Sequence, residues 1–129
     1  MIVGVGVDIV DIARMKLAVE RNKNIIYKIL TKSELEQLPN LDILSERFLE
    51  SLSARFAAKE AFVKSMGLSL FSVGIQNIEI LKPSGSDKPQ IGFSPVCEVA
   101  HEGEGFLFHL SISHSNTSAI ATVIAESKD

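Results

Sequence analysis

The sequence predicts one α+β domain in which a largely antiparallel sheet packs on a long central helix. Three patterns indicate this fold: a strand-like alternation over residues 2–10, a long helical stretch over residues 44–66, and a strand hairpin over residues 105–126. Because strand patterns lie at both ends of the chain and helical ones between them, the order differs from the alternation of doubly wound folds. The 129 residues are enough to bury about two-thirds of the unfolded surface in one core, so residues 1–129 are expected to form a single domain.

The first strand has one apolar face and one nearly bare face. Val and Ile residues occupy the first, whereas Gly4, Gly6 and Asp8 occupy the second. A face without side chains lets a metal or a phosphate approach the backbone, which makes Asp8 a candidate ligand. The alternative is a strand-end aspartate that accepts hydrogen bonds from a turn. The segment is not a dinucleotide-binding fingerprint, because Ile9 stands where the third glycine belongs.

Two short helices are predicted between the first strand and the long helix. Asp11 is the expected N-cap of the first of them, which the sequence NKN then ends. The second is expected to begin after Thr31 or Ser33 as its cap. Glu34 then lies in its first turn, and Pro39 ends it.

The long helix over residues 44–66, which Gly67 is expected to end, carries a carboxylate among apolar residues. Because side chains three or four residues apart stack on one face of a helix, Glu60 falls in the apolar stripe. A carboxylate facing a core without a partner is costly or becomes protonated, so we expect a cation beside it: Lys64, an arginine or a metal. The alternative is an ordinary surface pair between Glu60 and Lys64, worth about 0.2–0.5 kcal/mol. The other members of the stripe are Leu49, Leu52, Phe56 and Val63.

The second half of the chain is predicted to be mostly extended. Residues 72–83 have the composition of a strand, residues 84–89 that of a turn, and residues 90–95 begin another extended piece. Residues 105–114 alternate apolar and polar side chains, and residues 118–126 return after a short turn. These last two segments predict an antiparallel hairpin.

Composition restricts the class of protein. With 13 basic and 16 acidic side chains the net charge is −3, which argues against a nucleic-acid binder held by its whole surface. Cys97 is the single cysteine, so neither a disulfide framework nor a thiolate zinc site is expected, and a reducing cytoplasm is the predicted location. The apolar start meets Asp8 too early for a signal peptide. No stretch approaches the roughly 20 apolar residues of a membrane span, so no membrane association is expected.

Three blocks of sequence stand in the order and separation of a known family. They are GVGVDIVDIAR at residues 4–14, ARFAAKEAFVKSMG at residues 54–67 and HLSISHS at residues 109–115. Together they resemble the holo-acyl-carrier-protein synthases, the small group within the 4′-phosphopantetheinyl transferases. Residues 29–36 and 77–91 also resemble that family, so the likeness extends over nearly the whole chain and implies its fold.

The resemblance implies transfer of the phosphopantetheine arm of coenzyme A to a serine hydroxyl of an apo-acyl-carrier protein. It also implies release of adenosine 3′,5′-bisphosphate and a requirement for Mg²⁺. Family members hold the metal with the aspartate of the first block and the glutamate of KEA, which correspond to Asp8 and Glu60. By the same resemblance, Lys64 contacts the phosphates and offsets charge on the leaving group. Either Glu60 or a water on the metal accepts the serine proton.

Further residues are implied to bind the coenzyme. Arg55 resembles the family arginine at the nucleotide end of coenzyme A, and His114 resembles a histidine near its phosphates. Gly67 and Pro89 correspond to positions that line the coenzyme pocket. Each has an ordinary alternative: a solvated helix residue for Arg55, a helix stop for Gly67, and turn residues for Pro89 and His114.

The protein partner is predicted from charge. Acyl-carrier proteins are strongly acidic, whereas residues 14–32 hold six basic side chains and one acid. Arg14 and Arg21 are two helical turns apart on one face and form a stripe that can orient an acidic helix; the alternative is a solvated basic face. The resemblance also places a carrier-contacting arginine at Arg14. It further implies a homotrimer with active sites between subunits.

Two other classes of function use the same residues. One is a metal-dependent phosphohydrolase acting on a small phosphate ester, and the other is a noncatalytic coenzyme-binding oligomer. A hydrolase would release 4′-phosphopantetheine without a carrier protein, whereas a binding module would leave coenzyme A intact and gain thermal stability from it.

Overall fold

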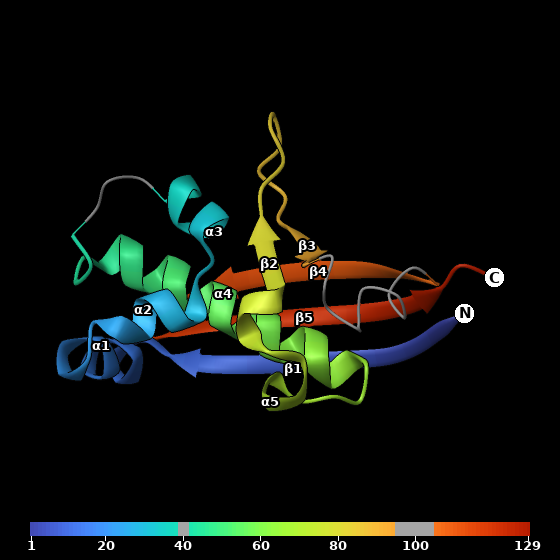
Figure 1. The fold of residues 1–129 in the computed structure, drawn as a ribbon, viewed down its shortest axis with the longest axis horizontal. Helices are drawn as coiled ribbons and strands as arrows, with labels where there is room; N and C mark the ends of the chain where they lie inside the picture. The colour runs from blue at the N-terminus through green and yellow to red at the C-terminus, as the bar shows by residue number, and fades with distance from the viewer. Residues whose placement is uncertain (39–41, 95–104) are drawn as a thin grey trace.

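The computed structural model describes residues 1–38, 42–94 and 105–129 (Figure 1). Its main sheet has three antiparallel strands in the order β1-β5-β4. A separate antiparallel pair joins β2 and β3. The predicted α+β class and antiparallel pairing are therefore confirmed, and β1 pairs with the strand from the opposite end of the chain. The strands are β1 (Ile2–Asp11), β2 (Ile78–Leu81), β3 (Gln90–Phe93), β4 (Phe106–His114) and β5 (Ser118–Ser127).

The helices cover one face and one end of the main sheet. The longest, α4, packs along β1 and β5, while α1, α2 and α3 gather at the end away from the two chain termini (Figure 1). Apart from residues 39–41 and 95–104, which are not described, the chain has no helix with the length and hydropathy of a membrane span. The helices are α1 (Ile12–Arg21), α2 (Asn24–Ile29), α3 (Lys32–Gln37), α4 (Glu46–Ser65) and α5 (Leu70–Val73).

Local sequence signals set several helix ends as predicted. Asp11 caps α1, because its Oδ1 accepts a hydrogen bond from the Ala13 N–H at 2.9 Å. Thr31 caps α3 and forms a reciprocal capping box with Glu34. Gly67 follows α4 with φ +70°, a conformation that favours glycine. The predicted helix end at Pro39 lies outside the described residues.

The structure differs from the sequence prediction in two places, with one more short helix than expected and one strand that is shorter. The segment after NKN forms α2, whose buried Ile26 and Ile29 pack into the core shared by α1 and α4. Residues 72–83 do not form one strand: α5 and a 3₁₀ turn (Ile75–Asn77) come first, and only Ile78–Leu81 is extended. Packing overrode the short-range composition at α2, whereas α5 begins with a local capping box between Ser69 and Ser72 that the strand prediction overlooked.

The bare face of β1 is covered by α4. A Cβ on Gly4 would lie 1.8 Å from the Ser65 carbonyl oxygen, and one on Gly6 would lie 1.8 Å from that of Ala61. The expectation that these glycines let a metal or phosphate reach the backbone is therefore wrong. They instead allow helix and strand to touch, which brings the next residue on this face, Asp8, beside α4.

The opposite face of β1 is uncovered. Val3, Val5, Val7 and Ile9 are between 50% and 65% exposed. A continuous row of exposed aliphatic side chains on an edge strand is typical of a surface that contacts another molecule.

Candidate functional site

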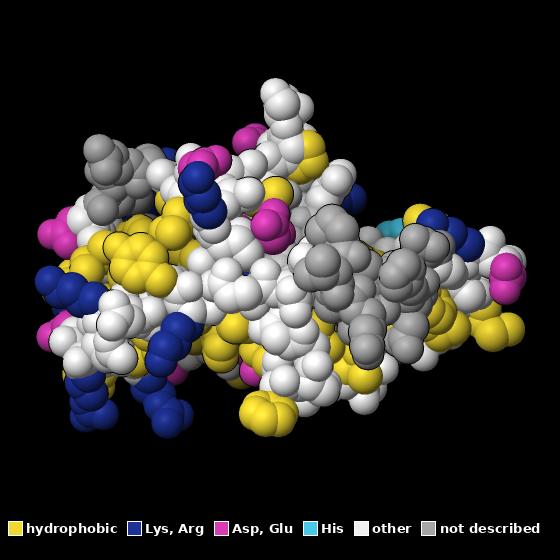
Figure 2. All heavy atoms as spheres, in the orientation of Figure 1, with side chains coloured by type: hydrophobic (Ala, Val, Ile, Leu, Met, Phe, Trp, Pro, Cys, Tyr) yellow, Lys and Arg dark blue, Asp and Glu magenta, His cyan; other side chains and the backbone are white. Residues whose placement is uncertain are grey.

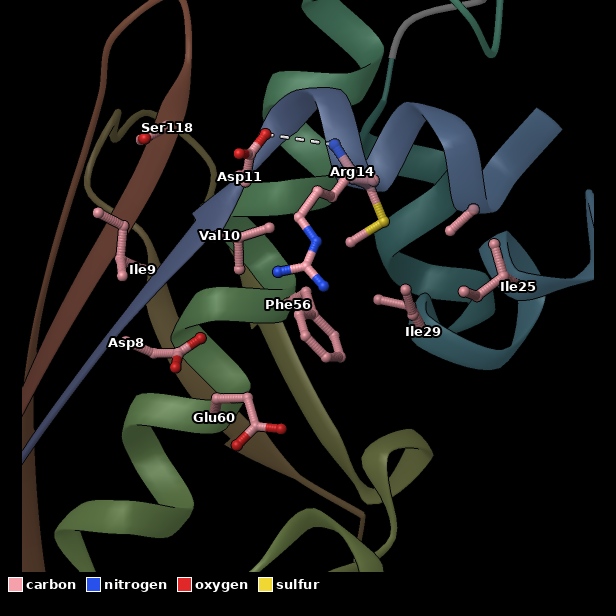
Figure 3. Close-up of a pocket in the computed structure, with 12 residues that line it drawn as sticks. Asp8, Ile9, Val10, Asp11, Arg14, Ile25, Ile29, Phe56, Glu60 and Ser118 are labelled. Atoms are coloured by element: carbon pink, nitrogen blue, oxygen red, sulfur yellow. Dashed lines mark hydrogen bonds between the residues drawn. The ribbon is translucent and has the colours of Figure 1, made fainter. Parts of the chain in front are cut away.

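A cleft of about 800 Å³ lies between β1, α1, α2 and α4 and contains both predicted metal ligands. Asp8 enters it from β1 and Glu60 from α4, and Figure 3 shows the two carboxylates at the same end of the cleft. This arrangement follows from the contact of α4 with the glycines of β1. The remainder of the wall is mostly apolar and includes Val10, Met15, Ile25, Ile29 and Phe56.

Lys64 is bound to the aspartate of this pair. Its Nζ donates to Asp8 Oδ1 at 3.0 Å and to the Val7 carbonyl oxygen at 3.2 Å. Within the described ranges, the ion pair of Lys64 is with Asp8, and none joins it to Glu60. Burial, and then the Asp8 carboxylate, raise the pKa of Glu60 above its ordinary value, while Lys64 opposes this shift. Glu60, which was predicted to fall in the apolar stripe of the long helix, is therefore a partly buried carboxylate with the Asp8 carboxylate near it.

The donor set of this cleft fits a hard cation. Carboxylate oxygens are the ligands that Mg²⁺ prefers, and Mg²⁺ commonly keeps several waters. The described part of the chain contains no group of three or more His, Cys, Asp or Glu side chains that could hold a metal. A metal at Asp8 and Glu60 would thus depend on water or substrate oxygens for the rest of its coordination.

The predicted partner-binding arginines lie on the exposed face of α1. Arg14 lines the cleft, and its side chain extends from α1 toward Phe56 (Figure 3). Arg21 lies in the last turn of the same helix and is exposed, but it does not line the cleft. Exposed Leu17 lies between them on the same face. Lys and Arg side chains gather over the α1 and α2 end of the molecule in Figure 2.

A second cleft, of about 330 Å³, contains three of the predicted coenzyme-binding residues: Arg55, Pro89 and His114. His114 Nδ1 lies 3.7 Å from Glu50 Oε2. The other two predicted coenzyme-binding residues, Lys64 and Gly67, line neither cleft. The structure therefore brings the first three residues together and places them in a different cleft from Asp8, since the two clefts have no lining residue in common.

The charged residues that are wholly buried were not among the predicted site residues. Glu34 and Lys59 are both 0% exposed, and Lys59 Nζ lies 2.6 Å from Glu34 Oε1. Burial lowers the pKa of Lys59, and Glu34 opposes that shift. Sequence spacing contained a signal for Lys59, which is three or four residues from both Arg55 and Phe62 on the inward side of α4. For Glu34, the sequence pattern indicated only a capping box and not a buried ion pair.

Comparison with known proteins identifies relatives over the full length. A model of the 4′-phosphopantetheinyl transferase superfamily matches residues 4–123. The holo-[acyl-carrier-protein] synthase of Oceanobacillus iheyensis is 37% identical over 129 residues, covering 100% of both chains. That of Enterococcus faecalis is 38% identical over 128 residues, covering 99% of this chain and 100% of the relative.

Solved structures show the same fold. The Bacillus anthracis holo-(acyl-carrier-protein) synthase in complex with CoA (3′,5′-ADP) superposes with a TM-score of 0.81 at 32% identity, covering 99% of each chain. The Helicobacter pylori holo-[acyl-carrier-protein] synthase in complex with coenzyme A gives a TM-score of 0.75 at 28% identity, covering 95% of this chain and 99% of that one.

Proposed function

Because this chain belongs to the 4′-phosphopantetheinyl transferase superfamily, and within it to the holo-[acyl-carrier-protein] synthases, we propose the following reaction. The enzyme transfers 4′-phosphopantetheine from coenzyme A to a serine of apo-acyl-carrier protein, depends on Mg²⁺ and releases adenosine 3′,5′-bisphosphate. The observation that carries this proposal is the meeting of Asp8 and Glu60 in one cleft, beside an exposed basic helix. The lone cysteine supports a cytoplasmic location.

The two carboxylates share one task in this proposal, which is to hold the metal. Asp8 and Glu60 would hold Mg²⁺, which when bound supplies charge neutralisation and alignment of the pyrophosphate of coenzyme A. The serine oxygen attacks the β-phosphorus as the bond to the nucleotide phosphate breaks. Glu60, or a water held beside it, accepts the serine proton.

In this proposal, Lys64 stabilises the charge on the leaving group. Its side chain is half exposed and held at Asp8 by hydrogen bonds to a carboxylate and a carbonyl. A flexible ammonium in this place can turn to the phosphate oxygens and offset the charge that develops on the departing nucleotide. Its contribution is therefore made in the transition state.

The carrier protein would dock on α1. Arg14 and Arg21 present positive charge on an exposed face, with Leu17 between them supplying apolar area. Acidic partners are oriented by such charges before contact. Because Arg14 also lines the cleft that holds Asp8, a carrier bound to this face would have its serine near the carboxylate pair.

A homotrimer with sites between subunits is part of the proposal. Arg55 and Glu60 are five residues apart on α4, roughly 140° around the helix, and they line different clefts. A second subunit would allow one coenzyme to contact both kinds of cleft. The exposed aliphatic row of β1, Val3 to Ile9, supplies an apolar surface for such an assembly.

Mass spectrometry tests the reaction directly. Apo-acyl-carrier protein incubated with this enzyme, coenzyme A and Mg²⁺ should gain the mass of 4′-phosphopantetheine, and adenosine 3′,5′-bisphosphate should appear in equal amount. Free 4′-phosphopantetheine formed without carrier would indicate a phosphohydrolase instead. Unchanged coenzyme A that nevertheless raises the Tm would indicate a binding protein.

A further inference from the structure

A buried charge cluster connects the helices to the second cleft. Glu34 Oε1 accepts hydrogen bonds from Lys59 Nζ at 2.6 Å and from the Thr31 N–H at 2.9 Å. Its Oε2 accepts from the Ile80 N–H at 3.1 Å. One carboxylate in α3 thus binds α4 and β2 together, and it does so at 0% exposure.

Lys59 is fully satisfied within this cluster. Besides Glu34, its ammonium group donates to the carbonyl oxygens of Ile29 at 2.5 Å and Ile75 at 3.4 Å. Three acceptors match the three donors of an ammonium group. The pair of Glu34 and Lys59 is therefore complete as a structural unit, without any further cation.

Arg55 is the additional cation, and it is incompletely bound. Its Nε lies 3.8 Å from Glu34 Oε2, which is an ion-pair distance but too long for a hydrogen bond. Nε is also buried without a hydrogen-bond partner. The side chain is nevertheless 10% exposed and lines the second cleft, so the exposed part is not the Nε edge.

Lys59 limits how Glu34 can bind Arg55. A free carboxylate tends to grip a guanidinium with both oxygens, but Oε1 is occupied by Lys59 and Thr31. Arg55 Nε is paired with Oε2, which also accepts the Ile80 N–H. The second edge of the guanidinium is therefore left for another anion, and two cations share one carboxylate. This is an arrangement suited to binding a phosphate at the cleft.

We propose that Glu34 is a positioning residue for coenzyme binding. It holds the buried Nε edge of Arg55 so that the terminal guanidinium nitrogens face the second cleft and bind a phosphate of the nucleotide half of coenzyme A. This inference rests on the proposed function, which supplies the ligand. Preorganisation of this kind acts on coenzyme affinity and not on the acid–base step, since Glu34 reaches Arg55 of the second cleft and does not line the cleft of Asp8 and Glu60.

The test removes the anchor of Arg55 without leaving Lys59 buried and unpaired. Glu34→Gln alone leaves Lys59 buried and unpaired, a change that can prevent folding. The main variant is therefore the double replacement Glu34→Gln with Lys59→Met, compared with Arg55→Ala and with the triple variant. Glu36→Gln, an exposed glutamate of the same helix, is the matched control. The measurements are kcat, both KM values and the Kd of adenosine 3′,5′-bisphosphate by calorimetry.

We expect the double variant to raise the KM for coenzyme A and the Kd about tenfold, the scale of one lost charged contact. The kcat and the carrier KM should stay within about twofold of wild type. The triple variant should bind coenzyme no more weakly than Arg55→Ala, because Glu34 acts through Arg55. The inference is overturned if the double variant has a normal KM for coenzyme A or raises both KM values equally. It is also overturned if the triple variant binds coenzyme more weakly than Arg55→Ala. Absence of transfer by the wild-type enzyme would instead remove the proposed function.

Discussion

Lys64 Nζ lies 3.0 Å from Asp8 Oδ1, so an ammonium group occupies one of the two carboxylates proposed to hold the metal. A cation bound to a ligand competes with another cation for that ligand. In the proposed mechanism, Lys64 therefore leaves Asp8 when metal and coenzyme bind.

Replacing Lys64 separates metal binding from transfer. We expect Lys64→Met to tighten Mn²⁺ binding to the free enzyme several-fold, because a positive charge is removed from beside Asp8, measured by calorimetry or by electron paramagnetic resonance of free Mn²⁺. The same variant should lower kcat at least tenfold, since the leaving group loses its cation. Weaker Mn²⁺ binding in Lys64→Met would mean that the lysine supports the metal site and does not compete with it.

Glu60→Gln should nearly abolish transfer, by about 100-fold or more in kcat/KM, since it keeps the shape of a proposed ligand and base but removes its charge. Mass spectrometry of the carrier over time measures the rate. Near-normal turnover at saturating Mg²⁺ would return Glu60 to a structural role.

The stability of the metal-free enzyme gives an independent signal for Glu60. Its raised pKa means that the folded state disfavours the charged carboxylate, so stability is lost as the pH rises from the unfolded pKa of Glu60 through its folded pKa. Glu60→Gln should therefore raise the Tm at pH 7, and the difference should vanish below pH 4.5, the ordinary pKa of glutamate, where the group is protonated in both states. Glu36→Gln is the control, and a lower Tm for Glu60→Gln at pH 7 would contradict the desolvation argument.

Arg14→Glu should raise the KM for the carrier protein about tenfold while changing the coenzyme KM little, because its charge faces an arriving acidic partner. The difference from wild type should shrink as salt rises, since exposed charges are screened over about 8–10 Å near physiological ionic strength. Lys16→Glu, the same charge change on another side of α1, is the matched control. An effect on coenzyme KM alone would place Arg14 in the nucleotide site.

Gly6→Ala should destabilise the protein by about 1–3 kcal/mol or more, because the added Cβ would overlap the Ala61 carbonyl oxygen at 1.8 Å. Urea unfolding measures this, and transfer should fall as well because Asp8 moves away from α4. Gly92→Ala, whose Cβ would meet its nearest atom at 4.0 Å, is the control. Equal stability of the two variants would show that β1 and α4 can separate without cost.

Val5→Lys should break the proposed trimer, because it places charge on the exposed aliphatic row of β1. Light scattering should show the wild type near three times the chain mass of 14.1 kDa and the variant near one. Phe71→Lys, which alters a side chain that is 99% exposed on α5, tests whether any exposed apolar residue has this effect. A monomeric wild type that transfers normally would remove the trimer.

Features with local causes could be predicted from the sequence. The cap at Asp11, the stop at Gly67 and the two-residue alternation of β4 depend on neighbours within a few positions, so they were predicted correctly. The family could be predicted for a related reason, because its motifs are continuous blocks of sequence. Pairing of Asp8 with Glu60 was predictable only on the condition that the first strand meets the long helix.

Features that depend on which surfaces meet could be seen only in the folded chain. It showed that α4 covers the glycine face of β1, that Glu34 and Lys59 find each other across 25 positions, and that Arg55 and Glu60 line different clefts. It also formed α2, whose apolar residues are buried in a cluster with residues of α1 and α4. Such outcomes follow from long-range burial and charge pairing, whose free energies depend on partners that no local stretch of sequence contains.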